Sequence, residues 1–287
     1  MSSSRAFWVR FCGIGAAAAG LSLLWLQAQQ APKQPIAVQK VTDNLWVLMT
    51  NSSGNVAVYP TSEGVLLVDD KFDQDGPEIL AKVKAISDKP IKYILNTHQH
   101  GDHTGGNAFM MTNTPAEILI HKNARANMVA GKQPGLPQIT YADEAQVFLG
   151  GKEVSAHHLG RGHTNGDAVI LFPSERVLHT GDLFVNGSAP FIDYSAKGSI
   201  VEWDKTLDRV LALDFDIVIP GHGPVAKKAD LVKWRNSIAE LRSRAKAACA
   251  GGVGDAAKRL DLSGLNMDNS LGFLNRSMAG MCAELAE

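Results

Sequence analysis

Four side chains that can bind a metal ion fall within six consecutive positions of this 287-residue chain: His98, His100, Asp102 and His103. Imidazole nitrogens combined with a carboxylate oxygen suit zinc, or the similar ions iron and manganese, better than calcium. Glycines within and just after this segment leave the backbone free to bend, so that a loop can turn the four side chains toward one point. The spacing therefore predicts a transition-metal site.

Three isolated residues of the same chemical type occur later in similar surroundings. His163 stands in Gly-His-Thr, Asp182 in Gly-Asp and His222 in Pro-Gly-His-Gly, and each closely follows a run that is typical of a strand. Buried histidines and carboxylates are costly unless they are paired or bind a metal. Because α/β folds place their sites where loops from several strand ends converge, we expect these residues to join the first four in one cleft.

Short apolar runs separated by turn residues predict the strands that carry these loops. The predicted strands are 44–50, 56–59, 64–69, 91–96, 116–121, 145–148, 152–159, 168–172, 176–180 and 216–219. The strand at 91–96 leads directly into the histidine cluster.

Helices are predicted at 75–86, 202–213 and 228–248, with a weaker one at 275–286. In the first of them, Ile79, Leu80, Val83 and Ile86 recur at the helical period. Strands and helices are mixed in both halves of the chain. This mixture favours an α/β class, with a layered sandwich rather than a pure β-barrel.

The composition is that of an ordinary globular protein, with 45% hydrophobic and 20% charged residues. The formal net charge is −1, so there is no basic excess to displace counterions from a nucleic acid. We therefore expect a small-molecule substrate and no nucleic-acid partner. The sequence leaves the oligomeric state open.

The N-terminal residues have the three parts of a secretory signal. Arg5 and Arg10 precede an uncharged run at 11–26, and the small residue Ala28 follows it. The run is short for a membrane span, although an uncleaved N-terminal anchor is an alternative. We expect 1–28 to be a signal peptide, 29–39 a Pro/Gln-rich linker, and the mature protein to be secreted to the periplasm.

Cleavage of that signal would remove Cys12 and leave two of the three cysteines, Cys249 and Cys282. In an oxidising compartment the two can form a disulfide. Two separate buried thiols are equally compatible with the sequence, which gives neither their distance nor their orientation.

Taken in order, the motifs His-x-His-x-Asp-His, Gly-His-Thr, Gly-Asp and Pro-Gly-His-Gly resemble those of the metallo-β-lactamase superfamily. The resemblance covers about residues 40–225, and the run from Gly64 to Asp69 resembles the first motif of that family. It implies a four-layer αβ/βα sandwich at 40–250 with a metal site at one edge. Residues 251–287 would then form a C-terminal helical extension.

The resemblance also implies a role for each candidate ligand in a site for two zinc ions, with iron or manganese as substitutes. One ion would bind His98, His100 and His163. The other would bind Asp102, His103 and His222. Asp182 would bridge both ions, together with a hydroxide that attacks the substrate, while Asp102 would also act in catalysis by orienting the nucleophile or moving a proton. Asp69 would support the histidine loop.

The same motifs narrow the substrate class. One group of zinc β-lactamases has Cys at the position of Asp182 and lacks an equivalent of His103, and another usually has Ser instead of the bridging Asp. The full set here resembles lactonases and glyoxalase II-type thioesterases. We expect a metal-dependent hydrolase acting on a β-lactam or a lactone. A thioester- or persulfide-processing enzyme, or a non-catalytic periplasmic metal-binding relay protein, is the alternative.

The remaining residues of chemical interest have simpler interpretations. Structural positions are expected for His121, His157, His158 and His179. Asp167 is expected to brace the His163 loop or to cap a turn. Packing is favoured over a substrate-contacting wall for Phe184, Phe191, Tyr194 and Trp203.

Overall fold

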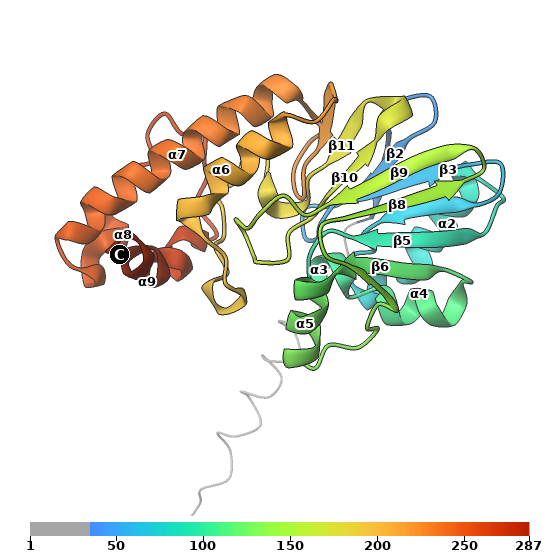
Figure 1. The fold of residues 1–287 in the computed structure, drawn as a ribbon, viewed down its shortest axis with the longest axis horizontal. Helices are drawn as coiled ribbons and strands as arrows, with labels where there is room; N and C mark the ends of the chain where they lie inside the picture. Colours follow the sequence, from blue (N-terminus) through green and yellow to red (C-terminus); the bar gives the residue numbers. More distant parts are fainter. Residues whose placement is uncertain (1–34, 287) are drawn as a thin grey trace, which may run out of the picture. The chain divides into compact units, whose positions relative to one another are not determined.

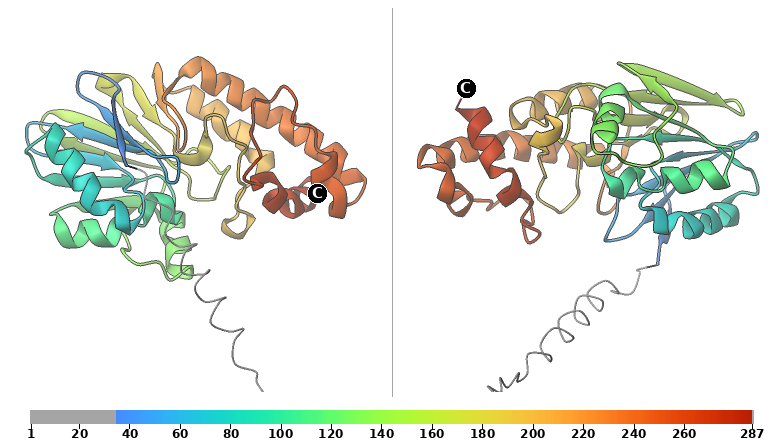
Figure 2. Two further views of the ribbon diagram at one scale, coloured as in Figure 1. Left: turned by 180° about the vertical axis from the view of Figure 1, so that it is seen from behind. Right: turned by 90° about the horizontal axis from the view of Figure 1, so that it is seen from below.

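The computed structural model describes residues 35–286, and from Ile36 onward they form one compact unit. Two β-sheets pack face to face, with helices on both outer faces (Figure 1 and Figure 2). These are the four layers of the expected α/β sandwich, which is confirmed.

The first sheet has seven strands in chain order. They are β1 (Ala37–Lys40), β2 (Trp46–Met49), β3 (Val56–Pro60), β4 (Val65–Val68), β5 (Ile91–Asn96), β6 (Glu117–His121) and β7 (Ile139–Tyr141). The first four pair antiparallel and the remaining pairings are parallel. Parallel neighbours need crossovers, which contain α2 (Gly76–Ile86), α3 (Gly101–Thr104), α4 (Asn107–Asn113) and α5 (Lys122–Ala130).

The second sheet has six strands in the order β13-β12-β11-β10-β9-β8. Their bounds are Glu144–Leu149 (β8), Lys152–His157 (β9), Val169–Phe172 (β10), Val177–His179 (β11), Ile217–Ile219 (β12) and Ala226–Lys227 (β13). Only the pairing of β11 with β12 is parallel among the described strands of this sheet. That crossover contains α6 (Ile200–Leu211).

The C-terminal part adds α7 (Lys228–Ala250), the short α8 (Ala256–Arg259) and α9 (Phe273–Leu285). Single turns of 3-10 helix occur at η1 (Asp73–Asp75), η2 (Pro173–Glu175), η3 (Gly181–Leu183), η4 (Tyr194–Ala196) and η5 (Val253–Asp255). Cys249 of α7 and Cys282 of α9 form a disulfide, with their Cα atoms 5.3 Å apart. Among residues 35–286, no helix has both the length and the apolar character needed to cross a membrane.

Successive side chains of a strand in the first sheet point to opposite faces, so a strand there can contribute to two hydrophobic cores. On β3, Ala57 and Tyr59 face the second sheet, while Val56 and Val58 face the outer helices. The cluster on the outer side includes Ile79 of α2 and further residues of α2 and α4. Both faces of the central strands β3 and β4 are therefore buried, which explains why these strands appear in the sequence as nearly continuous apolar runs.

A third core lies between the second sheet and α6, α7 and α9. Trp203 of α6, Trp234 of α7 and Met278 of α9 belong to one buried cluster with Val169 and Val218 of the sheet. In Figure 1, α6 and α7 run side by side. The segment expected as a helical extension therefore packs against the second helical layer.

The structure differs from several sequence-based expectations. Strand β1 begins at Ala37, inside the expected linker at 29–39. It was not predicted because its residues are all exposed and lack an apolar pattern. Helices α4 and α5 and strands β7 and β13 were not predicted; α5, for example, buries only Ala124 and Met128. The expected signal peptide at 1–28 lies outside the described residues.

Candidate metal centre

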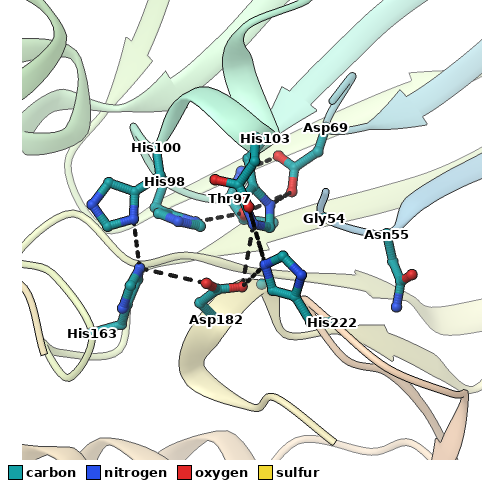
Figure 3. A network of polar contacts seen from close by, with 12 residues as sticks. Gly54, Asn55, Asp69, Thr97, His98, His100, His103, His163, Asp182 and His222 are labelled. Carbon is teal, nitrogen blue, oxygen red and sulfur yellow. Dashed lines mark hydrogen bonds and ion pairs between the residues drawn. The ribbon is translucent and has the colours of Figure 1, made fainter. Parts of the chain in front are cut away.

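The seven candidate ligands come from four different loops at one edge of the two sheets. His98 and His100 follow β5, and Asp102 and His103 lie on α3. The other three come from the second sheet: His163 lies between β9 and β10, Asp182 follows β11 in η3, and His222 follows β12. The structure brings all seven together, as Figure 3 shows for the six of them that it labels.

One trio of imidazoles consists of His98, His100 and His163, whose ligand atoms lie within 4.8 Å of one another. Nε2 of His163 is 2.8 Å from Nδ1 of His100. Three imidazoles facing one point are a donor set that suits zinc.

A second trio consists of Asp102, His103 and His222, again with ligand atoms within 4.8 Å. Nε2 of His222 lies 3.1 Å from the Asp102 carboxylate and 3.3 Å from Nε2 of His103. This set offers one carboxylate and two imidazoles.

Asp182 lies between the two trios. Its Oδ1 is 3.2 Å from Nε2 of His103, and its Oδ2 is 3.6 Å from Nε2 of His163. One carboxylate oxygen thus faces each set, which is the arrangement expected for a bridging ligand.

Hydrogen bonds on the outer side of three rings determine which ring nitrogen carries the proton. His100 Nε2 lies 2.8 Å from Asp193, His163 Nδ1 lies 2.7 Å from the Phe191 carbonyl, and His103 Nδ1 lies 2.8 Å from Asp69. Because these oxygens only accept, the outer nitrogen is the N–H donor in each case. The inner nitrogen of each ring is then the one that faces the site, and it can bind a metal once it carries no proton.

Asp69 supports the histidine loop in the way that the family resemblance implied. Its carboxylate is fully buried and accepts hydrogen bonds from the Thr97 amide and hydroxyl, each at 2.8 Å, as well as from His103. Its backbone has a φ of 62°, in the left-handed region. Asp193, which supports His100, was not identified from the sequence.

Two buried atoms at the centre have no hydrogen-bond partner among the described residues: Nε2 of His98 and Oδ1 of Asp182. Burial, together with His103 and His163, lowers the pKa of His98 well below its usual value, and burial with His100 lowers that of His163 to about 4. Both imidazoles are therefore neutral near pH 7, as metal binding requires. A cation would give both unpartnered atoms a ligand bond, so the residues fit a metal.

The second trio has the opposite electrostatics. Burial raises the pKa of Asp102, but His103 and His222 outweigh it and hold the pKa at about 2. Burial lowers the pKa of His222, but Asp182 and Asp102 raise it to about 9. In the metal-free protein, protons on His103 and His222 balance the negative charge of Asp102 and Asp182. Binding of a cation would release these protons.

Residues outside the motifs hold the loop of His222 in place. The side-chain amide of Asn55 donates to the carbonyls of Pro220 and Gly223, each at 2.9 Å. A Cβ at Gly221 would overlap the Asp182 carboxylate, so only glycine fits there. Asn55 follows a turn in the sequence, where no motif marked it.

The other histidines and Asp167 have the structural positions that were expected. His179 donates from Nε2 to the Asn55 carbonyl and accepts from the Gly181 amide at Nδ1. His121 and His158 stack on each other, with ring centroids 3.9 Å apart. Asp167 accepts hydrogen bonds from the Gly162 and Thr164 amides, which brace the loop on both sides of His163.

A cleft of about 860 Å³ opens beside the ligands. Its apolar wall includes Phe72, Phe191 and Phe273. Packing is the role of Phe184 and Trp203, which are 3% and 0% exposed. Of the four aromatic residues for which packing was favoured, Phe191 is therefore the exception.

A four-layer sandwich with a trio of histidines and an adjoining trio of one Asp and two His at one sheet edge defines a class of metal-dependent proteins. The sequence model of the metallo-beta-lactamase superfamily matches residues 49–222, and the chain belongs to this family.

Relatives and solved structures agree with this placement. A type 2 metallo-beta-lactamase of Bacillus cereus is 27% identical over 209 residues, covering 69% of this chain and 80% of that relative. Another type 2 enzyme, from Elizabethkingia meningoseptica, is 23% identical over 80% of this chain and 95% of its own. The crystal structure of DIM-1 metallo-beta-lactamase has the same fold, with a TM-score of 0.64 at 21% identity, covering 72% of this chain and 98% of its own.

Proposed function

We propose that the protein is a zinc-dependent hydrolase that cleaves the acyl bond of a small cyclic molecule, either a β-lactam or a lactone. The observation that carries the proposal is the position of Asp182, with one carboxylate oxygen facing each trio. A site with two adjoining trios and a shared carboxylate suits two ions. The family relationship to metal-dependent hydrolases supports the same conclusion.

Zinc ions bound by these residues would lower the pKa of water and polarise the acyl oxygen of a substrate. The chain's own contribution is to fix the geometry. Asp102 is partly exposed and lines the cleft, so its ionised carboxylate can accept a hydrogen bond from the attacking water and orient it. His100 and His222 also line the cleft, so the reacting group would meet both trios.

The cleft supports a small substrate. Its volume of about 860 Å³ lies in the range typical of sites for small molecules. Apolar walls and a polar floor are suited to a compact ring with one hydrolysable acyl group. Relatives named as metallo-beta-lactamases favour the β-lactam, and the full ligand set with both His103 and Asp182 favours the lactone.

We also propose that the protein acts after export to the periplasm. The disulfide between Cys249 and Cys282 supports this location, because structural disulfides persist in oxidising compartments and are rare in the cytosol. Cell fractionation of the full-length chain tests it: the proposal predicts a periplasmic product shortened near residue 28, and a full-length product in the cytosolic fraction contradicts it.

Hydrolysis of a chromogenic cephalosporin, a homoserine lactone and a thioester by metal-quantified protein tests the activity. We expect turnover of the lactam or the lactone that a chelator abolishes and zinc restores. Turnover of the thioester alone would assign the protein to the alternative class. Zinc binding without turnover of any panel member would instead support a non-catalytic relay protein.

The Asp182→Ala variant tests the shared ligand directly. We expect zinc content to fall toward one ion per chain and activity to fall with it. Asp43→Ala is the matched control, since the Asp43 side chain is 96% exposed and remote from the motifs. Two tightly held ions in Asp182→Ala would contradict the bridging role.

A further inference from the structure

One cationic side chain borders the cleft, on a helix beyond the segment that the family model matches. Arg276 lies in the first turn of α9 and is the one Lys or Arg among the described residues that line the cleft. The residue is exposed, and within residues 35–286 its guanidinium group forms no hydrogen bond or ion pair. Its N–H donors are therefore free to bind a ligand.

Two aromatic rings hold this guanidinium group in place. Its carbon lies 4.6 Å from the ring centroid of Phe191 and 5.0 Å from that of Phe273. The two rings are neighbours, with centroids 6.3 Å apart. Stacking leaves the N–H edge of an arginine available for a planar anion, and a side chain held in advance loses less entropy on binding.

Phe191 also connects the arginine to the metal centre. Its ring centroid lies 6.1 Å from the ring of His100 and 6.0 Å from the ring of His163. Its carbonyl accepts the hydrogen bond from His163. A single aromatic side chain thus separates Arg276 from the first trio, so a small molecule lying along Phe191 can reach both.

Away from the metal centre, Arg276 is the site for an anion among the described residues of the cleft. Asp102 and Asp182 face the two trios. Asp268 lies on the same rim, but its carboxylate accepts hydrogen bonds from the Ser270 amide and hydroxyl at 3.0 and 2.7 Å. A carboxylate on the substrate would therefore bind Arg276.

We infer that the substrate is a carboxylic acid, whose carboxylate binds the Arg276 guanidinium while its acyl ring lies along Phe191 at the metal centre. This inference rests on the proposed acyl hydrolysis and adds the substrate class: a cyclic acyl compound that also carries a carboxylate. Arg276 is then a specificity-determining residue, with no part in the chemical step.

Steady-state kinetics with matched substrates tests the inference. A chromogenic cephalosporin and a lactone with a carboxylate side chain are each compared with their methyl esters, using zinc-loaded wild type and Arg276→Gln. We expect KM for the acids to rise about 10-fold in the variant, a loss of about 1.4 kcal/mol, with kcat changed less than about 2-fold and the esters unaffected. Arg276→Lys should lie between the two because it keeps the charge and loses the planar fork.

The matched control is Lys258→Gln, which changes the net charge equally at an 83% exposed side chain in the same C-terminal region. We expect it to leave every KM unchanged. Equal KM values for acids in wild type and Arg276→Gln, with turnover intact, would overturn the inference and leave the proposed function standing.

A binding measurement separates this result from failure of the proposed function. Calorimetry measures 4-phenylbutanoate and 4-phenylbutanamide on zinc-loaded wild type and Arg276→Gln. We expect the wild type to bind the acid about 10-fold more tightly than the variant does, while the amide binds both equally. If no acyl substrate is turned over, the proposed function fails, and the Arg276-dependent difference still decides whether the cleft binds carboxylates.

Discussion

Replacement of Asp69 by Asn should impair the second trio through one of its members, His103, although Asp69 itself lies outside both trios. Asp69 accepts the Nδ1–H of His103 and both donors of Thr97. An amide has one acceptor oxygen and one NH2 group. Where that NH2 group faces His103, it favours the tautomer that carries the proton on Nε2, the atom that should present a lone pair.

The size of the effect follows from the contacts that change. Loss of a support for a ligating histidine costs about 10- to 100-fold in metal affinity. Loss of one or two hydrogen bonds to a buried carboxylate costs about 2–4 kcal/mol of unfolding free energy. Backbone strain adds little, because Asn tolerates the left-handed φ of 62° at this position.

Competition with a chromogenic chelator measures the zinc affinity of each site, and urea unfolding of zinc-free protein measures stability. Asp70→Asn is the control. Asp70 is also fully buried, and burial with the neighbouring Asp69 raises its pKa well above the usual value. Because burial disfavours the charged form of the Asp70 carboxyl, a neutral amide should be tolerated there. Unchanged zinc affinity and unchanged stability in Asp69→Asn would refute the reasoning.

Three further predictions follow from contacts around the centre. Asp193→Asn should lower zinc affinity at the first trio about 10- to 100-fold, because Asp193 holds the proton of His100 on Nε2; the same competition assay checks this, and equal affinities would contradict it. Reduction of Cys249–Cys282, which are 33 residues apart, should lower the unfolding free energy by about 4 kcal/mol; an unchanged urea midpoint would argue against it. Burial raises the pKa of Asp167 to about 7, although hydrogen bonds from Thr164 and Gly162 lower it in part. Its contribution to stability is therefore fully present below about pH 4 and is lost as pH rises through about 7. Zinc-free Asp167→Asn should lack this part of the pH dependence, and identical profiles would exclude it.

The central strands could be predicted because burial on both sides makes most of their residues apolar. Strand β5 was expected at 91–96 and has those bounds. Strand β1 is held by backbone pairing with β2 and exposes all four residues, so no sequence pattern marks it. Helix α5 buries two residues along its length, too few to give an apolar face. Secondary structure could be predicted where burial requires a regular pattern of apolar residues.

The same reasoning applies to the centre. The ligands could be found because chemistry restricts them to few residue types at strand ends. Supporting residues have no such restriction: Asp193 meets His100 across 93 positions, and Asn55 meets the Pro220 carbonyl across 165. Both roles depend on which loops the fold brings together, and no local sequence pattern predicts these long-range contacts.

Substrate choice should depend more on α9 than on the motifs. The two trios would meet only the reacting acyl group, which β-lactams and lactones share, so they would distinguish poorly between one acyl compound and another. Phe273 and Arg276 come from α9, which is joined to α7 by the disulfide and lies outside the matched segment at 49–222. Phe191 belongs to the loop that supports His163 and also contacts Arg276. A change in α9 can therefore alter which molecule binds without altering the centre that acts on it.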